Sequence, residues 1–264
     1  MPKQRPTELI YQIFSLLIVF ILVHALYVAL IRPNAQAHLE QQAVALAADE
    51  NHVAQDSFYV VLRDYEQEAC LILMLWALAI LGYKGVRAWR QQRLLDRDLL
   101  QLPPDLPIGR EDTRLLSERL AALPPHLGDY VLPRALRVAV ERYAATGHVQ
   151  DVSTAGRGVC ESEGERMESE LSIIRYIAWA IPSVGFIGTV RGIGDALGQA
   201  HRAVAGDITG VTESLGVAFN STFVALVLSI VLMFFIHQVQ RMQEQLILDS
   251  ERYVDQWFIR RLRS

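Results

Sequence analysis

The sequence predicts an all-α integral membrane protein with four transmembrane helices and a helical cytoplasmic domain. Three observations support this class. Of the 264 residues, 52% are hydrophobic, and they gather into four blocks that approach or reach the length of a bilayer span. Basic residues cluster directly after the second and fourth blocks. The polar stretches between blocks show helical spacing and no alternation typical of strands. The formal net charge of -4, with no basic domain, argues against nucleic-acid binding.

The order of these blocks defines eight expected segments. They are transmembrane helix 1 within 1–32, an acidic periplasmic segment over 33–68, transmembrane helix 2 over 69–83, a cytoplasmic helical region over 84–172, transmembrane helix 3 over 173–194, a periplasmic loop over 195–214, transmembrane helix 4 over 215–236, and a cytoplasmic C-terminal helix over 237–264.

The first apolar stretch runs from Leu9 to Ile31 and ends at Arg32-Pro33. It is too long for the apolar core of a signal peptide, and no small-residue cleavage site follows it cleanly, so we expect a retained helix. His24 lies inside this helix. We expect a neutral, hydrogen-bonded histidine at a helix contact, and the alternative is a proton relay.

The second block, 69–83, is short, so we expect its ends to continue into the flanking helices. A basic cluster follows at once and indicates orientation, because basic residues beside membrane helices stay cytoplasmic. Its members are Lys84, Arg87, Arg90, Arg93 and Arg97. The cluster places 84–172 inside and the acidic segment outside. Both termini are then cytoplasmic, in agreement with further arginines at 241–263.

The cytoplasmic region reads as a small helical bundle with no catalytic role. Prolines separate two short amphipathic helices, expected over 110–122 and 134–145. Glutamates over 161–170 indicate a solvated helix face in preference to a metal site. No phosphate loop, metal-spaced cluster or nucleophile constellation is visible, so we expect no enzyme activity, no cofactor and no metal. Cys70 and Cys160 are expected to be unpaired packing residues.

The third and fourth apolar blocks each hold about 22 residues, which is about 33 Å of helix. Neither block contains Asp or Glu. One face of the fourth block is small and mildly polar, and its members are Leu215, Ala218, Thr222, Ala225, Ser229 and Leu232. A matching stripe on the third includes Pro182, Gly185 and Thr189. The threonine hydroxyls are candidates to line an ion path, and the alternative is that they bond to their own helix backbone.

The third and fourth blocks resemble a known family. The string P-x-x-G-x-x-G-T-V-x-G is similar to the second membrane helix of ExbB and TolQ, and it comprises Pro182, Gly185, Gly188, Thr189, Val190 and Gly192. The following A-F-N-S-T, with Ala218 and Thr222, resembles the third helix of those proteins and the fourth of MotA. The resemblance covers about 65 residues closely. Arg191 stands where the family usually has an aromatic residue, and Val217 stands near the position of a membrane glutamate in ExbB-type proteins.

The resemblance to the MotA/TolQ/ExbB proton channel family implies the channel-forming subunit of an ion-driven motor in a bacterial inner membrane. It implies five copies around two copies of a single-span ExbD/TolR/MotB-like partner, which brings an aspartate into the pore. Thr189, Thr222, Ala218, Ala225 and Ser229 would line the ion path. Pro182 and the glycines 185, 188 and 192 would shape it by close helix packing.

Several alternatives stay open on the residues alone. The ion is a proton or sodium, and the powered process is not specified. The chain could instead be a structural four-helix membrane scaffold without ion conduction, in which case the small residues serve packing alone. A membrane enzyme is a third class, for which the sequence offers no constellation of residues.

Overall fold

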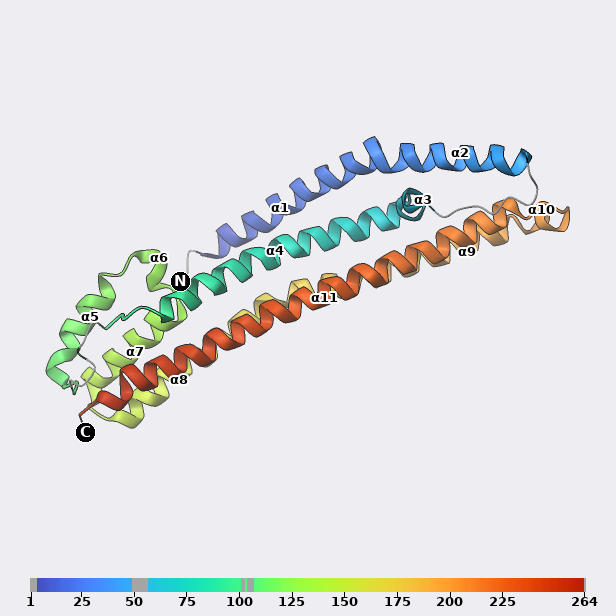
Figure 1. The fold of residues 1–264 in the computed structure, drawn as a ribbon. Helices are drawn as coiled ribbons and strands as arrows, with labels where there is room; N and C mark the ends of the chain where they lie inside the picture. The colour runs from blue at the N-terminus through green and yellow to red at the C-terminus, as the bar shows by residue number, and fades with distance from the viewer. Residues whose placement is uncertain (1–3, 49–56, 101–102, 104–106, 264) are drawn as a thin grey trace. The chain divides into compact units, whose positions relative to one another are not determined.

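The computed structural model describes residues 4–48, 57–100, 103 and 107–263 (Figure 1). Part of the expected acidic segment, residues 49–56, lies outside this range. The predicted all-α membrane fold is confirmed: four helical stretches are long and apolar enough to cross a membrane, namely Glu8–Ala45, Tyr65–Leu95, Val149–Gly198 and Thr209–Arg261. Across the described ranges the backbone forms no strand, only an isolated bridge between Ile108 and Leu262.

The elements follow one another in this order: α1 Gln4–Leu26, η1 Tyr27–Ile31, α2 Arg32–Ala48, α3 Phe58–Leu62, α4 Tyr65–Leu95, η2 Arg110–Asp112, α5 Thr113–Ala121, α6 Pro125–Gly128, α7 Val131–Thr146, α8 Val149–Glu170, α9 Ser172–Gly198, α10 Ala200–Val204, α11 Thr209–Trp257 and η3 Ile259–Arg261. They form two compact units. The first holds residues 1–81 and 173–236, and the second holds 82–172 and 237–264.

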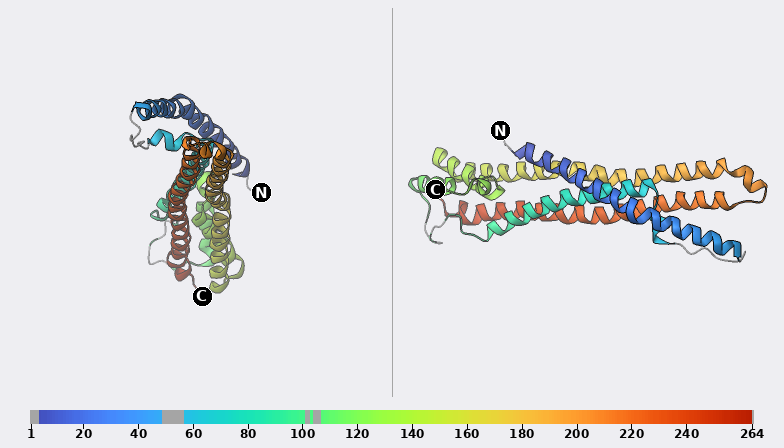
Figure 2. Two further views of the ribbon diagram at one scale, coloured as in Figure 1. Left: turned by 90° about the vertical axis from the view of Figure 1, so that its right-hand side faces the viewer. Right: turned by 90° about the horizontal axis from the view of Figure 1, so that it is seen from above.

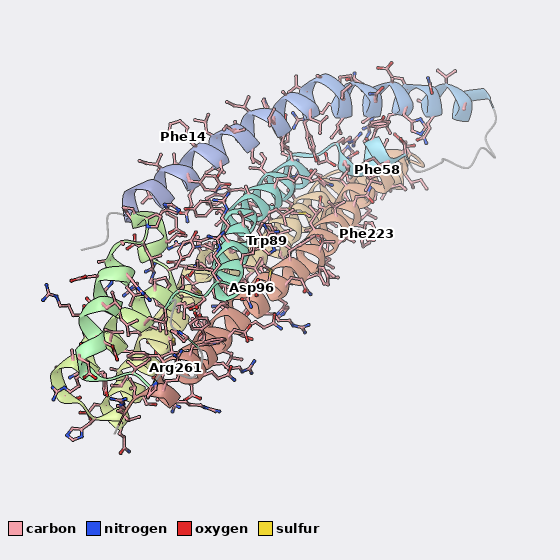
Figure 3. All side chains as sticks on the ribbon, turned by 60° about the vertical axis from the view of Figure 1, so that its left-hand side comes forward. Phe14, Phe58, Trp89, Asp96, Phe223 and Arg261 are labelled. Carbon is pink, nitrogen blue, oxygen red and sulfur yellow. The ribbon has the colours of Figure 1, made fainter. Side chains whose placement is uncertain are left out.

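The first unit contains the apolar parts of α1, α4, α9 and α11. Its small core includes Val23, Tyr27, Ile72 and Val224. A partly buried hydrogen bond joins α1 to α4, since the Trp76 indole N–H donates to the Gln12 carbonyl at 2.9 Å. Many large apolar side chains point outward, as Figure 3 shows for Phe14. An apolar exterior of this kind suits hydrocarbon, where polar groups must find partners inside the protein.

A π-helical turn, η1, lies between α1 and α2. Pro33 follows it, and proline has no N–H to donate to the carbonyl four residues earlier. The Arg32 backbone N–H instead donates to the Tyr27 carbonyl, five residues back. The wider turn absorbs the proline, so helical structure continues past Pro33 to Ala48 where the sequence indicated an end.

The second unit is a bundle of α5, α7, α8 and the ends of α4 and α11. Its core includes Leu116, Leu136, Tyr143 and Phe258, all almost fully buried. The Tyr143 hydroxyl lies 2.8 Å from the Arg263 carbonyl, so the buried ring also fixes the C-terminal segment. Gly147 ends α7 in the left-handed conformation, with φ of 71°, and turns the chain into α8. Helices α7 and α8 thus form the last part of the expected cytoplasmic helical region, and α8 leads into α9.

Candidate functional site

Helices α9 and α11 run side by side (Figures 1 and 2). A glycine stripe on α9 packs directly against a stripe of small residues on α11. A Cβ at Gly192 would lie 2.8 Å from the Cβ of Ala218, and one at Gly188 would lie 2.6 Å from the Cβ of Ser221. Gly185 lies even closer to Ala225. Because only glycine permits this approach, the spacing of the motif fixes how the two helices pack.

The two threonines meet at the centre of this contact. Thr189 on α9 and Thr222 on α11 share a hydrogen bond between their hydroxyls. The Thr189 hydroxyl also lies 3.0 Å from the Ala218 carbonyl and 3.4 Å from the Gly185 carbonyl of its own helix, and the Thr222 hydroxyl lies 3.3 Å from the Gly185 carbonyl. Each hydroxyl has one proton, so one threonine donates to the other, and the threonine that accepts donates to a carbonyl. Both side chains are partly buried. The structure therefore joins the two hydroxyls across the helix pair, between the close approaches at Gly185 and Gly192.

Pro182 creates a second polar link between the same helices. Its ring nitrogen cannot donate to the carbonyl of Ala178, one turn earlier on α9. The Ser229 hydroxyl of α11 donates to that carbonyl at 3.0 Å instead. In a hydrocarbon environment an unpaired carbonyl is costly, so Ser229 supplies the hydrogen bond that the proline removes. The Ser229 side chain is thus engaged in the helix contact within the subunit.

Ala218 and Ala225 are fully buried between α9 and α11, whereas Thr189 and Thr222 keep part of their surface. Neither alanine faces an open channel within the single chain. The expectation that these residues line an ion path concerns an assembly of several chains. It stays a prediction.

Polar residues of α4 lie at the level of this helix contact. Gln67 is fully buried, and its amide donates to the Ser221 hydroxyl at 3.4 Å. A Cβ at Gly188 would lie 3.1 Å from Cγ of Glu66. The Glu66 carboxylate accepts a hydrogen bond from Arg191 at 2.9 Å. Arg191, which departs from the family pattern, therefore neutralises an acid that α4 brings beside α9.

Glu68 forms a second ionic contact, between α4 and the first helix. Its carboxylate is 5% exposed and lies 2.7 Å from Nδ1 of His24 and 2.5 Å from a guanidinium nitrogen of Arg32. His24 and Arg32 are eight positions apart, which in a regular α-helix would turn them about 80° away from each other. The π turn between them is wider and reduces this offset, so both reach the same carboxylate. His24 is therefore hydrogen-bonded at a helix contact.

The sequence analysis did not predict the ionic contacts of Glu66 and Glu68. Glu66 and Glu68 open α4, which starts at Tyr65, ahead of the span expected from 69. They were assigned to a solvated outer segment because a run of acids normally faces water. The signal in the sequence was the presence of cationic side chains inside or at the ends of apolar blocks, namely His24, Arg32 and Arg191. Such side chains need acidic partners. No local pattern joins residues so far apart in the chain.

A polar cavity of about 580 Å³ lies where α9 ends and α11 begins. Charged residues line much of it, among them Arg63, Asp64, Arg191 and Glu213. Arg63 donates to Glu213 at 2.9 Å and so connects the segment before α4 with the start of α11. Burial raises the pKa of the Asp64 carboxyl above its ordinary value, although Arg63 and Arg191 oppose this effect.

The basic cluster after the second span divides into two kinds of residue. Lys84 is almost fully buried and pairs with Glu170 at 2.8 Å. Arg90, Arg93 and Arg97 are exposed, and Arg93 stacks on the ring of Trp89 at 3.6 Å. Arg87 is half-buried. The exposed arginines can meet a lipid headgroup, whereas Lys84 joins α4 to the end of α8.

The chain is similar to a known protein family over the residues that contain the contact between α9 and α11. Residues 129–252 match the model of the MotA/TolQ/ExbB proton channel family. The match includes α7, α8, α9 and most of α11, and it contains the glycine stripe and both threonines. No curated protein and no solved structure matched the chain.

Proposed function

Because residues 129–252 of the chain belong to the MotA/TolQ/ExbB proton channel family, we propose that it is the channel-forming subunit of an ion-driven motor. The chain is a multi-pass membrane protein. In the proposal it lies in a bacterial inner membrane and forms a homo-oligomer of five copies. A single-span ExbD/TolR/MotB-like partner, in two copies, brings a membrane aspartate beside the threonine pair. Proton or sodium flow then drives work on the partner.

The threonine pair is the observation that carries this proposal. Thr189 and Thr222 place two hydroxyls together on helices that contain no acid in their apolar blocks. A hydroxyl both donates and accepts, so the pair can pass hydrogen bonds to water or to a carboxyl without holding a cation tightly. A proton path also needs a titratable group in the membrane. A partner carboxyl at this level would supply one next to the partly exposed hydroxyls.

One observation favours the scaffold alternative. Both hydroxyls already have partners inside the subunit, on each other and on the carbonyls of Gly185 and Ala218. Packing alone would explain these contacts. A scaffold would hold partner proteins in the membrane, and its complex with the partner would conduct no ions. A channel subunit would conduct ions only when its oligomer is assembled with the partner.

The proposed orientation has both termini in the cytoplasm. Exposed arginines follow the second span, and further arginines end the chain, which is the distribution expected on the cytoplasmic side. An external thiol reagent should label a Val44→Cys variant, on the exposed surface of α2, and should not label Arg114→Cys on α5. The opposite labelling pattern would invert the topology.

Ion flux through vesicles that hold the chain and its partner tests the mechanism. Thr222→Val keeps the shape and removes the hydroxyl, and a lost hydrogen bond of about 1 to 3 kcal/mol would slow transfer by roughly 5- to 100-fold. Thr189→Val should behave alike, and Thr222→Ser should keep most of the flux. Thr154→Val is the matched control, because Thr154 donates to its own helix on α8.

The outcome separates the two functions. Assemblies of Thr189→Val and Thr222→Val that conduct like the parent would make the threonines packing residues. A parent assembly that binds the partner and conducts no ions would favour the scaffold.

A further inference from the structure

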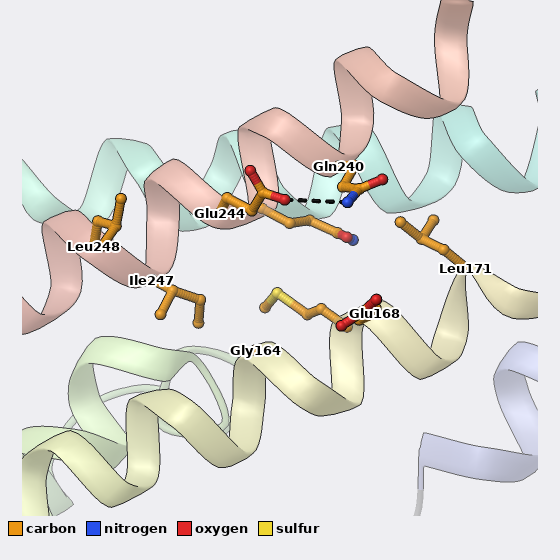
Figure 4. Close-up of a pocket in the computed structure, with 9 residues that line it drawn as sticks. Gly164, Glu168, Leu171, Gln240, Glu244, Ile247 and Leu248 are labelled. Atoms are coloured by element: carbon orange, nitrogen blue, oxygen red, sulfur yellow. Dashed lines mark hydrogen bonds between the residues drawn. The ribbon is translucent and has the colours of Figure 1, made fainter. Parts of the chain in front are cut away.

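An apolar groove with an acidic rim runs between α8 and α11 in the second unit (Figure 4). Its volume is about 360 Å³. Gly164 and Leu171 of α8 and Ile247 of α11 form its floor, and Glu168 and Glu244 stand at its exposed edges. The floor spans about seven residues of helix, roughly 10 Å. Leu248 is half-exposed beside the floor, so the groove is open to the outside along this edge.

A basic ridge lies on α4 in the same unit. Val86, Trp89, Arg90 and Arg93 recur at helical spacing and are all exposed. The stacking of Arg93 on Trp89 fixes an aromatic surface with a positive charge on it. The ridge spans about seven residues, again roughly 10 Å. Its length, its apolar centre and its charge therefore complement the groove.

The ridge and the groove lie on opposite sides of one helical layer. α4 packs against α8 through Lys84, which meets Glu170. The groove-lining positions of α8, such as Gly164, come one residue after those that face α4, such as Glu163, which is about 100° around the helix. On α4, Val86 comes two residues and Arg93 nine residues after Lys84. At about 100° per residue, both lie on the side of the helix opposite Lys84. The two complementary surfaces therefore cannot meet within one chain.

The ridge and the groove also lie at the same height along the unit. Near one end Lys84 pairs with Glu170, and near the other Gln92 donates to Asp249 at 2.7 Å. On α4 the ridge begins two residues after Lys84 and ends at Arg93, next to Gln92. The groove lining ends beside the partners of these two residues, at Leu171 after Glu170 and at Leu248 before Asp249. Complementary patches on opposite faces make a head-to-tail contact, and equal height lets successive copies close into a ring instead of a filament.

We propose that the α4 ridge of one copy docks into the α8–α11 groove of the next copy. Trp89 and Val86 meet the floor around Gly164 and Ile247, and Arg93 lies beside Glu244. The occupant of the groove is thus a second copy of this chain. The inference rests on the proposed homo-oligomer and specifies which cytoplasmic surfaces build it.

Disulfide cross-linking of the full chain in membranes tests the contact. In a Cys70→Ala/Cys160→Ala background, Trp89→Cys combined with Leu248→Cys should give a ladder of linked oligomers on oxidation. Each single variant should stay unlinked. Arg114→Cys with Leu248→Cys is the control pair, since Arg114 lies on α5 outside the ridge.

A charge exchange tests the complementarity. Arg93→Glu should lower the yield of linked oligomer by about tenfold, because it sets two acids against each other. Glu244→Arg in the same chain should restore the yield. Glu165→Arg, on α8 and outside the groove lining, should not restore it.

Native mass spectrometry of the parent separates the possible failures. An intact oligomer without the ladder would overturn the proposed contact and leave the channel proposal standing. A monomer under all conditions would overturn both. Cross-links from Leu248→Cys to a cysteine of the co-expressed partner, and not to Trp89→Cys, would assign the groove to that partner and overturn the contact.

Discussion

The serine that replaces the hydrogen bond lost at Pro182 offers a quantitative test of the helix contact. Ser229→Ala removes the hydroxyl that donates to the Ala178 carbonyl at 3.0 Å. Hydrogen bonds between membrane helices contribute on average about 0.6 kcal/mol and up to about 1.7 kcal/mol. An unpaired buried carbonyl adds to the cost. We therefore expect Ser229→Ala to lower the free energy of unfolding by about 1 kcal/mol.

The same reasoning predicts that the effect depends on the proline. Pro182→Ala restores an N–H on α9 that can donate to Ala178 in the ordinary helical pattern. In that background the Ser229 hydroxyl is no longer needed, so Ser229→Ala should cost close to zero. The interaction free energy of the double-mutant cycle should be about 1 kcal/mol.

Unfolding in mixed micelles of mild detergent and dodecyl sulfate, followed by tryptophan fluorescence, measures these differences. Ser183→Ala is the matched control, because the Ser183 hydroxyl bonds to the Trp179 carbonyl of its own helix. It should change stability little with or without the proline. Equal costs of Ser229→Ala in the parent and in the Pro182→Ala background would refute the proposed compensation.

Two further changes probe the contacts around the site. Gly188→Ala should destabilise the first unit by about 1 to 3 kcal/mol through overpacking against Ser221 and Glu66, while Gly194→Ala, where a Cβ has open space, should be neutral or slightly stabilising in the same unfolding assay. Equal effects would show that helix propensity, and not packing, decides. Arg32→Gln should cost about 3 kcal/mol because it leaves the Glu68 carboxylate with one partner fewer, and Glu68→Gln in the same chain should recover part of the loss. A double variant less stable than Arg32→Gln alone would contradict this account.

The glycine spacing and the four apolar blocks were readable from the sequence because both are local patterns. Gly185, Gly188 and Gly192 recur at three and four residues, so they had to share one face of a helix, and a facing stripe of small residues was visible on the fourth block. The structure places these stripes in contact. Hydropathy likewise predicted four spans, since it depends only on the composition of each stretch.

The ionic contacts were not readable because their partners are far apart in the chain. Glu66 meets Arg191, and Glu68 meets His24 and Arg32. An acid in a polar run has no local mark that separates a solvated side chain from a buried one. Lys84 shows the same limit, because it belongs to the basic run that indicates orientation, yet it is buried against Glu170. Only the packing of the helices decides these cases.

The glycine stripe on α9 also constrains the gene. Every first- or second-base change in a glycine codon encodes a residue with a Cβ or a stop signal, so no missense change at Gly185, Gly188 or Gly192 is chemically mild. A Cβ at each of these positions would overlap a neighbour on α11. Neutral drift in these codons is therefore restricted to the third base, while the codon of Gly194, two residues after Gly192 and on the open side of the helix, is free to vary at all three.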